Sequence, residues 1–288
     1  MKKVRLKFKV GKPQLTGEVE DAAQDAYIYA REVLKGRWPE AEPAIMKSPE
    51  YAMGYARYVI EGRWPEAEKT IAKCPESACS YAQYVLKNIR SEELEAGISI
   101  SPKWSFTYAR DVLGIRFYLG EPSLVAMPEY AVKYARDVIK GRWPEGEKAI
   151  LEDSKITFNY ARNVLNGERI PAVEAVISKH ASCSLRYAVD VLHDRFPEGE
   201  PVIAEDAEDA FKYAYLIVKG RWPEGEAAIA KHSYYSLQYA IVVLEDRFEA
   251  GEETISTSNA GDVRAYNEHM EKVEKRAEEK VDRLDDLV

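Results

Sequence analysis

The sequence predicts an all-α fold, a right-handed α-solenoid of nine two-helix repeats that are each 26 or 27 residues long. Three observations support this prediction. The dipeptide Tyr-Ala returns at that spacing, an Arg follows each of these Tyr residues by eight or nine positions, and a Glu follows each Arg by five. The repeated tyrosines are Tyr29, Tyr55, Tyr81, Tyr108, Tyr134, Tyr160, Tyr187, Tyr213 and Tyr239.

The first helix of each repeat is predicted around the Tyr-Ala pair. In the first repeat, Ala26, Tyr29, Ala30 and Val33 follow the three- and four-residue spacing of one helical face. We expect Gly36 to end this helix, because glycine readily takes a positive φ. Its equivalents are Gly62, Gly141 and Gly220.

The second helix is predicted to begin within a repeated string. GRWPEAE occupies 36–42 and 62–68, and GRWPEGE occupies 141–147 and 220–226. Pro39 suits the first helical turn, where its missing N–H loses no bond, and Glu40 and Glu42 favour the positive end of the helix dipole. The Trp position holds Phe or Ile in several other repeats, so we expect it to be a large apolar core position.

The Arg and the second Glu occur in all nine repeats and allow two interpretations. The guanidinium groups could line one groove and bind phosphates or carboxylates. Alternatively, each Arg pairs with a Glu of its own or a neighbouring repeat and holds the structure together. Because every Arg is accompanied by its Glu, we favour the structural interpretation. Representative members are Arg37, Glu42, Arg63, Glu68, Arg142, Glu147, Arg221 and Glu226.

The two ends of the chain differ from the repeats, which we expect to fill residues 21–258. Within residues 1–20, apolar residues alternate with Lys3, Arg5, Lys7 and Lys9, and this period of two predicts a β-strand. That strand could pair with another protomer, with a partner's sheet or with the short run 98–100, or it could lie over the first repeat. Residues 259–288 predict an amphipathic helix that either caps the array or forms a coiled coil.

Repeats eight and nine carry apolar residues directly after the Tyr-Ala pair, where earlier repeats are mostly polar. These residues are Tyr215 and Leu216 in repeat eight and Ile241 and Val242 in repeat nine. Helices that are apolar nearly all round need a covering surface. The candidates are the carboxyl-terminal helix and an external partner, so these four residues and the four basic residues of the amino-terminal arm are our candidate binding residues.

Composition argues against several classes of function. The net charge is −8, but residues 1–13 carry six basic residues and no acidic one, so the rest carries −14 and should repel nucleic acid. A nucleic-acid contact would have to use the basic arm. No long apolar run predicts a membrane span, and the amino terminus lacks an apolar signal region. Three cysteines without a CxxC pair favour a reducing, cytoplasmic setting.

Catalytic chemistry finds only weak support in the sequence. Four histidines show no metal-ligand spacing, and neither a catalytic triad nor a glycine-rich phosphate loop is visible. We therefore expect no catalytic residues, no metal and no cofactor, and we expect the protein not to be an enzyme.

The tandem string YAxxVLxGRWPEAE, over roughly residues 22–255, resembles short helical-repeat proteins encoded largely by bacteriophages and bacteria. This resemblance implies a role in host takeover or counter-defence. The leading expectation is a non-enzymatic scaffold that binds a protein partner, such as an inhibitor of a bacterial defence complex. The alternatives are an acidic protein that mimics or sequesters nucleic acid, and an assembly protein that forms homo-oligomers through its terminal strand or helix.

Overall fold

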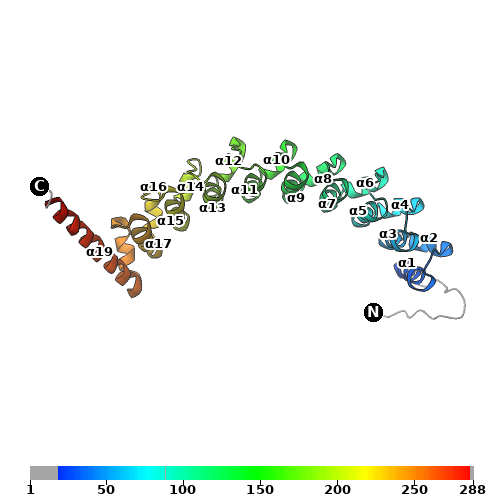
Figure 1. Cartoon of the computed structure of the whole chain (residues 1–288), viewed down its shortest axis with the longest axis horizontal. Helices are drawn as coiled ribbons and strands as arrows, with labels where there is room; N and C mark the ends of the chain where they lie inside the picture. Colours follow the sequence, from blue (N-terminus) through cyan, green and yellow to red (C-terminus); the bar gives the residue numbers. More distant parts are fainter. Residues whose placement is uncertain (1–18, 88, 286–288) are drawn as a thin grey trace. The chain divides into compact units, whose positions relative to one another are not determined.

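The computed structural model describes residues 19–87 and 89–285, with side chains from residue 22 to 279. Within these ranges the chain forms helices joined by short turns and contains no strand (Figure 1). The prediction of an all-α fold is confirmed to that extent. The predicted amino-terminal strand, with Lys3, Arg5, Lys7 and Lys9, lies outside the described residues.

Contacts group the chain into two compact units, residues 1–149 and residues 150–288. The division falls near the end of α10 (Pro144–Ile150). We call them unit 1 and unit 2, and each is described by itself.

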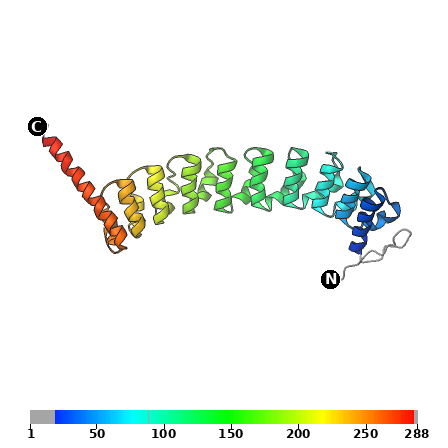
Figure 2. The same ribbon diagram turned by 60° about the horizontal axis from the view of Figure 1, so that its bottom comes forward.

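Unit 1 alternates a first and a second helix in every repeat, and neighbouring first helices pack side by side (Figure 2). Its first helices are α1 (Val19–Ile28), α3 (Pro49–Tyr55), α5 (Pro75–Tyr84), α7 (Pro102–Thr107) and α9 (Pro128–Tyr134). The second helices are α2 (Glu42–Ile45), α4 (Pro65–Ile71), α6 (Glu92–Ser99) and α8 (Glu121–Val125), followed by α10. Pro39 and its equivalents stand in the first turn of the second helical segment, as predicted.

Unit 2 repeats the same pattern and adds a long final helix. Its first helices are α11 (Ser154–Asn163), α13 (Ala181–Tyr187), α15 (Ala207–Tyr213) and α17 (Ser233–Gln238). The second helices are α12 (Pro171–Ile177), α14 (Glu200–Ile203), α16 (Pro223–Ile229) and α18 (Glu252–Ser256). Helix α19 (Ala260–Asp285) packs against α17 and α18.

Most first helices end in a widened, π-helical turn. These turns are η1 (Tyr29–Leu34), η3 (Ala56–Ile60), η4 (Tyr108–Leu113), η6 (Ala135–Ile139), η7 (Ala188–Leu192), η8 (Ala214–Val218) and η9 (Tyr239–Leu244). In the first repeat the carbonyl oxygen of Ala30 accepts hydrogen bonds from the N–H groups of both Lys35 and Gly36. Three short 3₁₀ turns, η2 (Pro39–Ala41), η5 (Tyr118–Gly120) and η10 (Glu249–Gly251), precede second helices.

The expectation that Gly36 takes the positive φ is wrong. The left-handed residue is Lys35, with φ 53°, and Glu61, Lys140 and Lys219 take its place before the other three glycines. The left-handed residue lies six positions after the repeated Tyr, and Lys87 and Asn166 hold the same place in repeats three and six. Glycine follows Lys35 and donates its N–H to the helix through a bond one residue wider than that of a Schellman motif.

The core of each unit is built from residues that recur at equivalent positions of the repeats. The Ala after each repeated Tyr is at most 2% exposed, and Trp38, Trp64, Trp143 and Trp222 are at most 5% exposed. The prediction that the Trp column fills the core is therefore confirmed. Each Trp or Phe packs on the Tyr of its own repeat, as the ring centroids of Tyr55 and Trp64, 5.1 Å apart, illustrate.

The 27-residue repeats three and six lack the π-helical turn and place their extra residue before the Arg. The idea that residues 98–100 offer a strand edge is wrong, because α6 runs to Ser99. Leu94 and Ile98 lie four residues apart on one helical face, and both are buried. Ile98 fills the same core position as Ile45 and Ile71 in the two preceding repeats.

The first part of α19 closes repeat nine. Tyr266, 27 residues after Tyr239, is 7% exposed and donates a hydrogen bond to Glu252, so it serves as the Tyr of a tenth half-repeat. Further along α19, Arg276 donates to the carbonyl oxygen of Glu245. Helix α19 thus caps the last repeat through Tyr266 and Arg276.

Candidate functional site

The repeated Arg and Glu form a planar ion pair within each repeat, between the end of the first helix and the start of the second. In repeat two, Arg63 Nε lies 2.7 Å from Glu68 Oε1, and Nη2 lies 3.1 Å from Oε2. The Glu68 side chain is 6% exposed, whereas that of Arg63 is 52% exposed. The same Nε–Oε1 contact, at 2.6 to 2.8 Å, occurs for Arg37, Arg90, Arg116, Arg142, Arg169, Arg195, Arg221 and Arg247.

The Tyr of the following repeat completes this junction. Tyr81 accepts a hydrogen bond from the backbone N–H of Trp64 at 2.6 Å, and its hydroxyl donates to Glu68 at 3.3 Å. The bond to the preceding Glu recurs for Tyr55, Tyr108, Tyr134, Tyr187, Tyr213, Tyr239 and Tyr266. Consecutive repeats are therefore joined by a buried phenol, which satisfies both a backbone donor and a carboxylate at Tyr55, Tyr81, Tyr134, Tyr213 and Tyr239.

Electrostatics keep these groups in the states that the junction requires. Burial raises the pKa of Tyr81 to about 12, so its hydroxyl stays protonated and donates to Glu68. In repeat seven, hydrogen bonds from Arg195 lower the pKa of Glu200, and they outweigh the opposing effect of burial with help from Tyr213. The carboxylate is thus held in its charged form.

Acid should weaken this junction, and Glu200→Gln should reveal its share. Because the folded pKa of Glu200 lies below its unfolded value of about 4.3, the carboxylate stabilises the fold above that value. This contribution disappears as the pH falls through the folded pKa. Urea unfolding should show Glu200→Gln less stable than the wild type at pH 7 and the gap closing toward pH 3, whereas the exposed-site control Glu205→Gln should change little at either pH. A gap of constant size would contradict this assignment.

The junction explains the Arg–Glu column without a ligand. Each guanidinium edge already contacts a carboxylate, so the column does not present free cations for phosphates. The structure supports the structural interpretation and places the pair within one repeat. The link from Tyr to the preceding repeat was not predicted, although the fixed spacing of 13 residues between Glu and the next Tyr was available as a signal.

A second feature lies in unit 2, where η8 and η9 pack against each other. A groove of about 440 Å³ is lined by Tyr215, Leu216, Lys219, Gly220, Val242, Val243 and Glu245. Tyr215 is 50% exposed, Leu216 43% and Val242 40%. Three of the four apolar residues singled out from the sequence thus line one exposed groove, while Ile241 is half-buried and lies outside its lining. The described part of helix α19 leaves Tyr215, Leu216 and Val242 exposed.

Aromatic residues continue the apolar surface of unit 2 next to this groove. The ring of Phe211 stacks on that of Tyr215, with centroids 6.2 Å apart, and also packs near Tyr235. Tyr234 is 52% exposed. Phe211, Tyr234 and Tyr235 were not predicted, because they lie outside the two positions after each Tyr-Ala pair.

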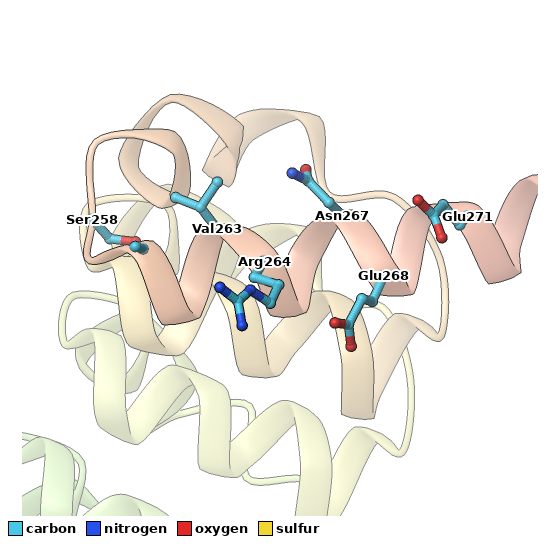
Figure 3. Close-up of a pocket in the computed structure, with 7 residues that line it drawn as sticks. Ser258, Val263, Arg264, Asn267, Glu268 and Glu271 are labelled. Carbon is cyan, nitrogen blue, oxygen red and sulfur yellow. The ribbon is translucent and has the colours of Figure 1, made fainter.

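A depression over α19 is polar in character. Ser258, Ala260, Val263, Arg264, Asn267, Glu268 and Glu271 line it. Figure 3 shows Val263, Asn267 and Glu271 along one line of the helix, and Arg264 and Glu268 along another. A polar outer face is typical of a capping element in a repeat protein, so this surface needs no ligand to explain it.

Two other properties can be stated for the described part of the chain. No group of three or more His, Cys, Asp or Glu side chains there is arranged to hold a metal ion. None of the helices in that part combines the length and the apolar character required to cross a bilayer.

The geometry of unit 2 therefore offers one exposed apolar groove as its candidate site. What binds there is not indicated by any relative, and the resemblance of the repeat string to phage and bacterial proteins stays an expectation. Comparisons with protein-family models, with curated proteins and with solved structures found no significant match to this chain.

Proposed function

We propose that this protein is a non-enzymatic scaffold that binds a partner protein through the groove between η8 and η9. The observation that carries the proposal is the exposure of Tyr215, Leu216 and Val242 along two adjacent helical segments. The equivalent positions of repeat five hold Arg136 and Asp137, which pair with each other and stay polar. Contiguous exposed apolar surface of this kind marks interaction sites.

The occupant that fits is an amphipathic helix of the partner. The groove runs between two packed helical segments, as in helix-in-groove recognition, where apolar residues three and four positions apart enter the groove. Lys219 and Glu245 stand among the lining residues. They offer one charge of each sign, so the proposed helix carries an acidic residue toward Lys219 and a basic residue toward Glu245.

The finer version of the proposal is a phage-encoded inhibitor of a bacterial defence complex, and it rests on the resemblance of the repeat string. It also keeps the expectation of a right-handed solenoid of nine repeats. Helix pairs stacked within each unit support that expectation. The cytoplasmic setting belongs to the same proposal and rests on the cysteine pattern.

Leu216→Glu tests the groove, with Asn163→Glu as the matched control. Both substitutions place Glu in the same column of unit 2, but Asn163 is an exposed polar residue outside the groove. The partner would be captured from bacterial lysate on the immobilised full chain, identified by mass spectrometry and purified. Titration calorimetry should then show wild-type affinity for Asn163→Glu and a loss of about tenfold or more for Leu216→Glu, because binding would bury an unpaired charge.

Equal affinity of wild-type protein and Leu216→Glu for the captured partner would refute the groove as the binding site. Light scattering at several concentrations addresses the alternative of an oligomeric assembly. A mass that rises with concentration in the wild type and not in Leu216→Glu would assign the groove to a second copy instead.

The charge of the chain favours one second candidate, an acidic protein that mimics or sequesters nucleic acid. Outside residues 1–13 the chain carries −14. A mimic would compete with DNA or RNA for the same partner, and its binding would weaken steeply with salt. Binding through the apolar groove should change little between low and physiological salt, so a salt series on the purified complex separates the two candidates.

A further inference from the structure

A ladder of alternating Tyr and Arg side chains crosses the first three repeats of unit 1, far in sequence from the groove of unit 2. Its members, which we call the Tyr–Arg ladder, are Tyr27, Arg31, Tyr58, Arg57 and Tyr84. The guanidinium carbon of Arg31 lies 4.7 Å from the ring centroid of Tyr58, and that of Arg57 lies 3.5 Å from the centroid of Tyr84 and 4.9 Å from that of Tyr58.

Packing holds this ladder in place from below. The ring of Tyr27 lies where a β-carbon on Gly54 would come within 3.2 Å of it, so the glycine admits the ring against the next helix. The hydroxyl of Tyr27 also orients Arg31, because it accepts a hydrogen bond from that guanidinium at 2.9 Å. Tyr58 and Tyr84 are each 45% exposed, so their rings are accessible at the surface.

Two later repeats of the same unit show what the Arg two positions after the repeated Tyr binds at its edge. Arg110 lies 4.7 Å from the centroid of the Phe106 ring. Its Nε and Nη2 donate to the two carboxylate oxygens of Asp111 at 2.6 and 2.7 Å. Arg136 forms the same fork with Asp137. Arg110 thus stacks with its face and binds a carboxylate with its edge.

Arg57 has the stacking partners but not the carboxylate. The position that holds Asp in repeats four and five holds Tyr58 in repeat two. Among the described residues no ion pair joins Arg57 to an acidic side chain, whereas Arg31 is bridged to Glu32 at 3.2 Å. A planar guanidinium that lies over aromatic rings keeps its edge donors available for a forked hydrogen bond to a carboxylate.

We propose that the Tyr–Arg ladder is a second interaction surface, which binds an acidic segment of a protein. An Asp or Glu carboxylate of that segment binds the edge of Arg57, and apolar groups beside it contact the exposed rings of Tyr58 and Tyr84. Tyr and Arg are the residue types that most often dominate binding energy at protein interfaces. A nucleic acid fits less well, since Glu32 and the negative charge of the surrounding chain oppose a polyanion along its whole length, whereas Arg57 needs only one carboxylate.

This inference is independent of the groove in unit 2. It uses different residues, a different unit and a different chemistry, so either proposal can fail without the other. Substitutions in one surface leave the other unchanged and serve as its controls.

Fluorescence anisotropy with a defined probe tests the ladder. The probe is a fluorescein-labelled dodecapeptide of alternating glutamate and leucine, and the control peptide replaces every glutamate with glutamine. The full chain should bind the glutamate peptide. Its affinity for the glutamine peptide should be lower by about tenfold or more, since a charge-assisted fork is lost. Arg57→Gln should lose the same factor for the glutamate peptide, while Arg136→Gln, whose edge is occupied by Asp137, should keep wild-type affinity.

Tyr58→Asp supplies the second variant, because it recreates next to Arg57 the arrangement that Arg110 has with Asp111. It should abolish peptide binding while the far-ultraviolet circular dichroism stays that of the wild type. Unchanged binding in Arg57→Gln or in Tyr58→Asp would overturn the proposal, as would equal binding of the two peptides. Tighter binding of oligothymidylate, lost in the same variants, would reassign the surface to single-stranded nucleic acid and overturn it as well.

Discussion

Gly97→Ala should destabilise unit 1 by about 3 kcal/mol, the upper part of the range for overpacking. A β-carbon on Gly97 would lie 2.0 Å from the carbonyl oxygen of Ala72 and 2.8 Å from its carbonyl carbon. Both atoms belong to the backbone at the end of α4, so no side chain can rotate away and α6 would have to shift. The gain of about 1 kcal/mol that Ala normally brings within a helix is too small to offset this.

Urea unfolding followed by circular dichroism measures the effect, and hydrogen exchange should locate it in α4 and α6. Gly141→Ala is the matched control, because a β-carbon there has no atom within 4 Å and the residue has no positive φ. It should change the free energy of unfolding by less than about 0.5 kcal/mol. A Gly97→Ala variant as stable as the control would show that the two second helices separate at little cost.

Trp222→Ala should cost about 3–5 kcal/mol in unit 2, the range for removing a large buried aromatic side chain. Trp222 is 1% exposed, and its ring lies 4.8 Å from that of Tyr213 by their centroids. Its backbone N–H donates to Tyr239 of the next repeat. A cavity at this point should therefore loosen both the repeat itself and its junction with the following one.

Trp222→Phe is the informative control for that experiment. Phe already fills the same position in other repeats, as Phe196 and Phe248, both fully buried, demonstrate. The Nε1 of Trp222 is buried and has no hydrogen-bond partner among the described residues, so Phe also removes an unsatisfied donor. We expect less than about 1.5 kcal/mol for Trp222→Phe, and hydrogen exchange should show lost protection of α15 and α17 only in Trp222→Ala. Equal losses in both variants would contradict the core role of the ring.

Much of the fold followed from the sequence because the repeat supplies nine copies of each position. Arg63 and Glu68 could be paired since neither occurs without the other in any repeat. The groove could be found because Leu216 and Val242 break a polar column. In both cases the equivalent positions of other repeats are informative: a residue found in every repeat is structural, and a residue that departs from the others marks a candidate site.

Features that depend on backbone geometry or on neighbouring repeats could not be read in this way. The left-handed residue is Lys35 rather than Gly36, and no single residue type marks that position in the other repeats. Tyr266 was missed because Asn267, not Ala, follows it. The ladder was missed because Arg31 stacks on Tyr58 of the next repeat, which a comparison of equivalent positions does not reveal.

The phenol at each junction also governs how such a chain can change in length. The Glu of each repeat accepts a hydrogen bond from one Tyr hydroxyl that follows it in the chain. At the end of unit 2, Tyr266 supplies this hydroxyl for Glu252. Any whole 26-residue module inserted between two repeats would bring one Tyr for the module before it and one Glu for the module after it. The length of the array can therefore grow by duplication without new chemistry at any joint, and only the terminator, Tyr266 on α19, must stay last.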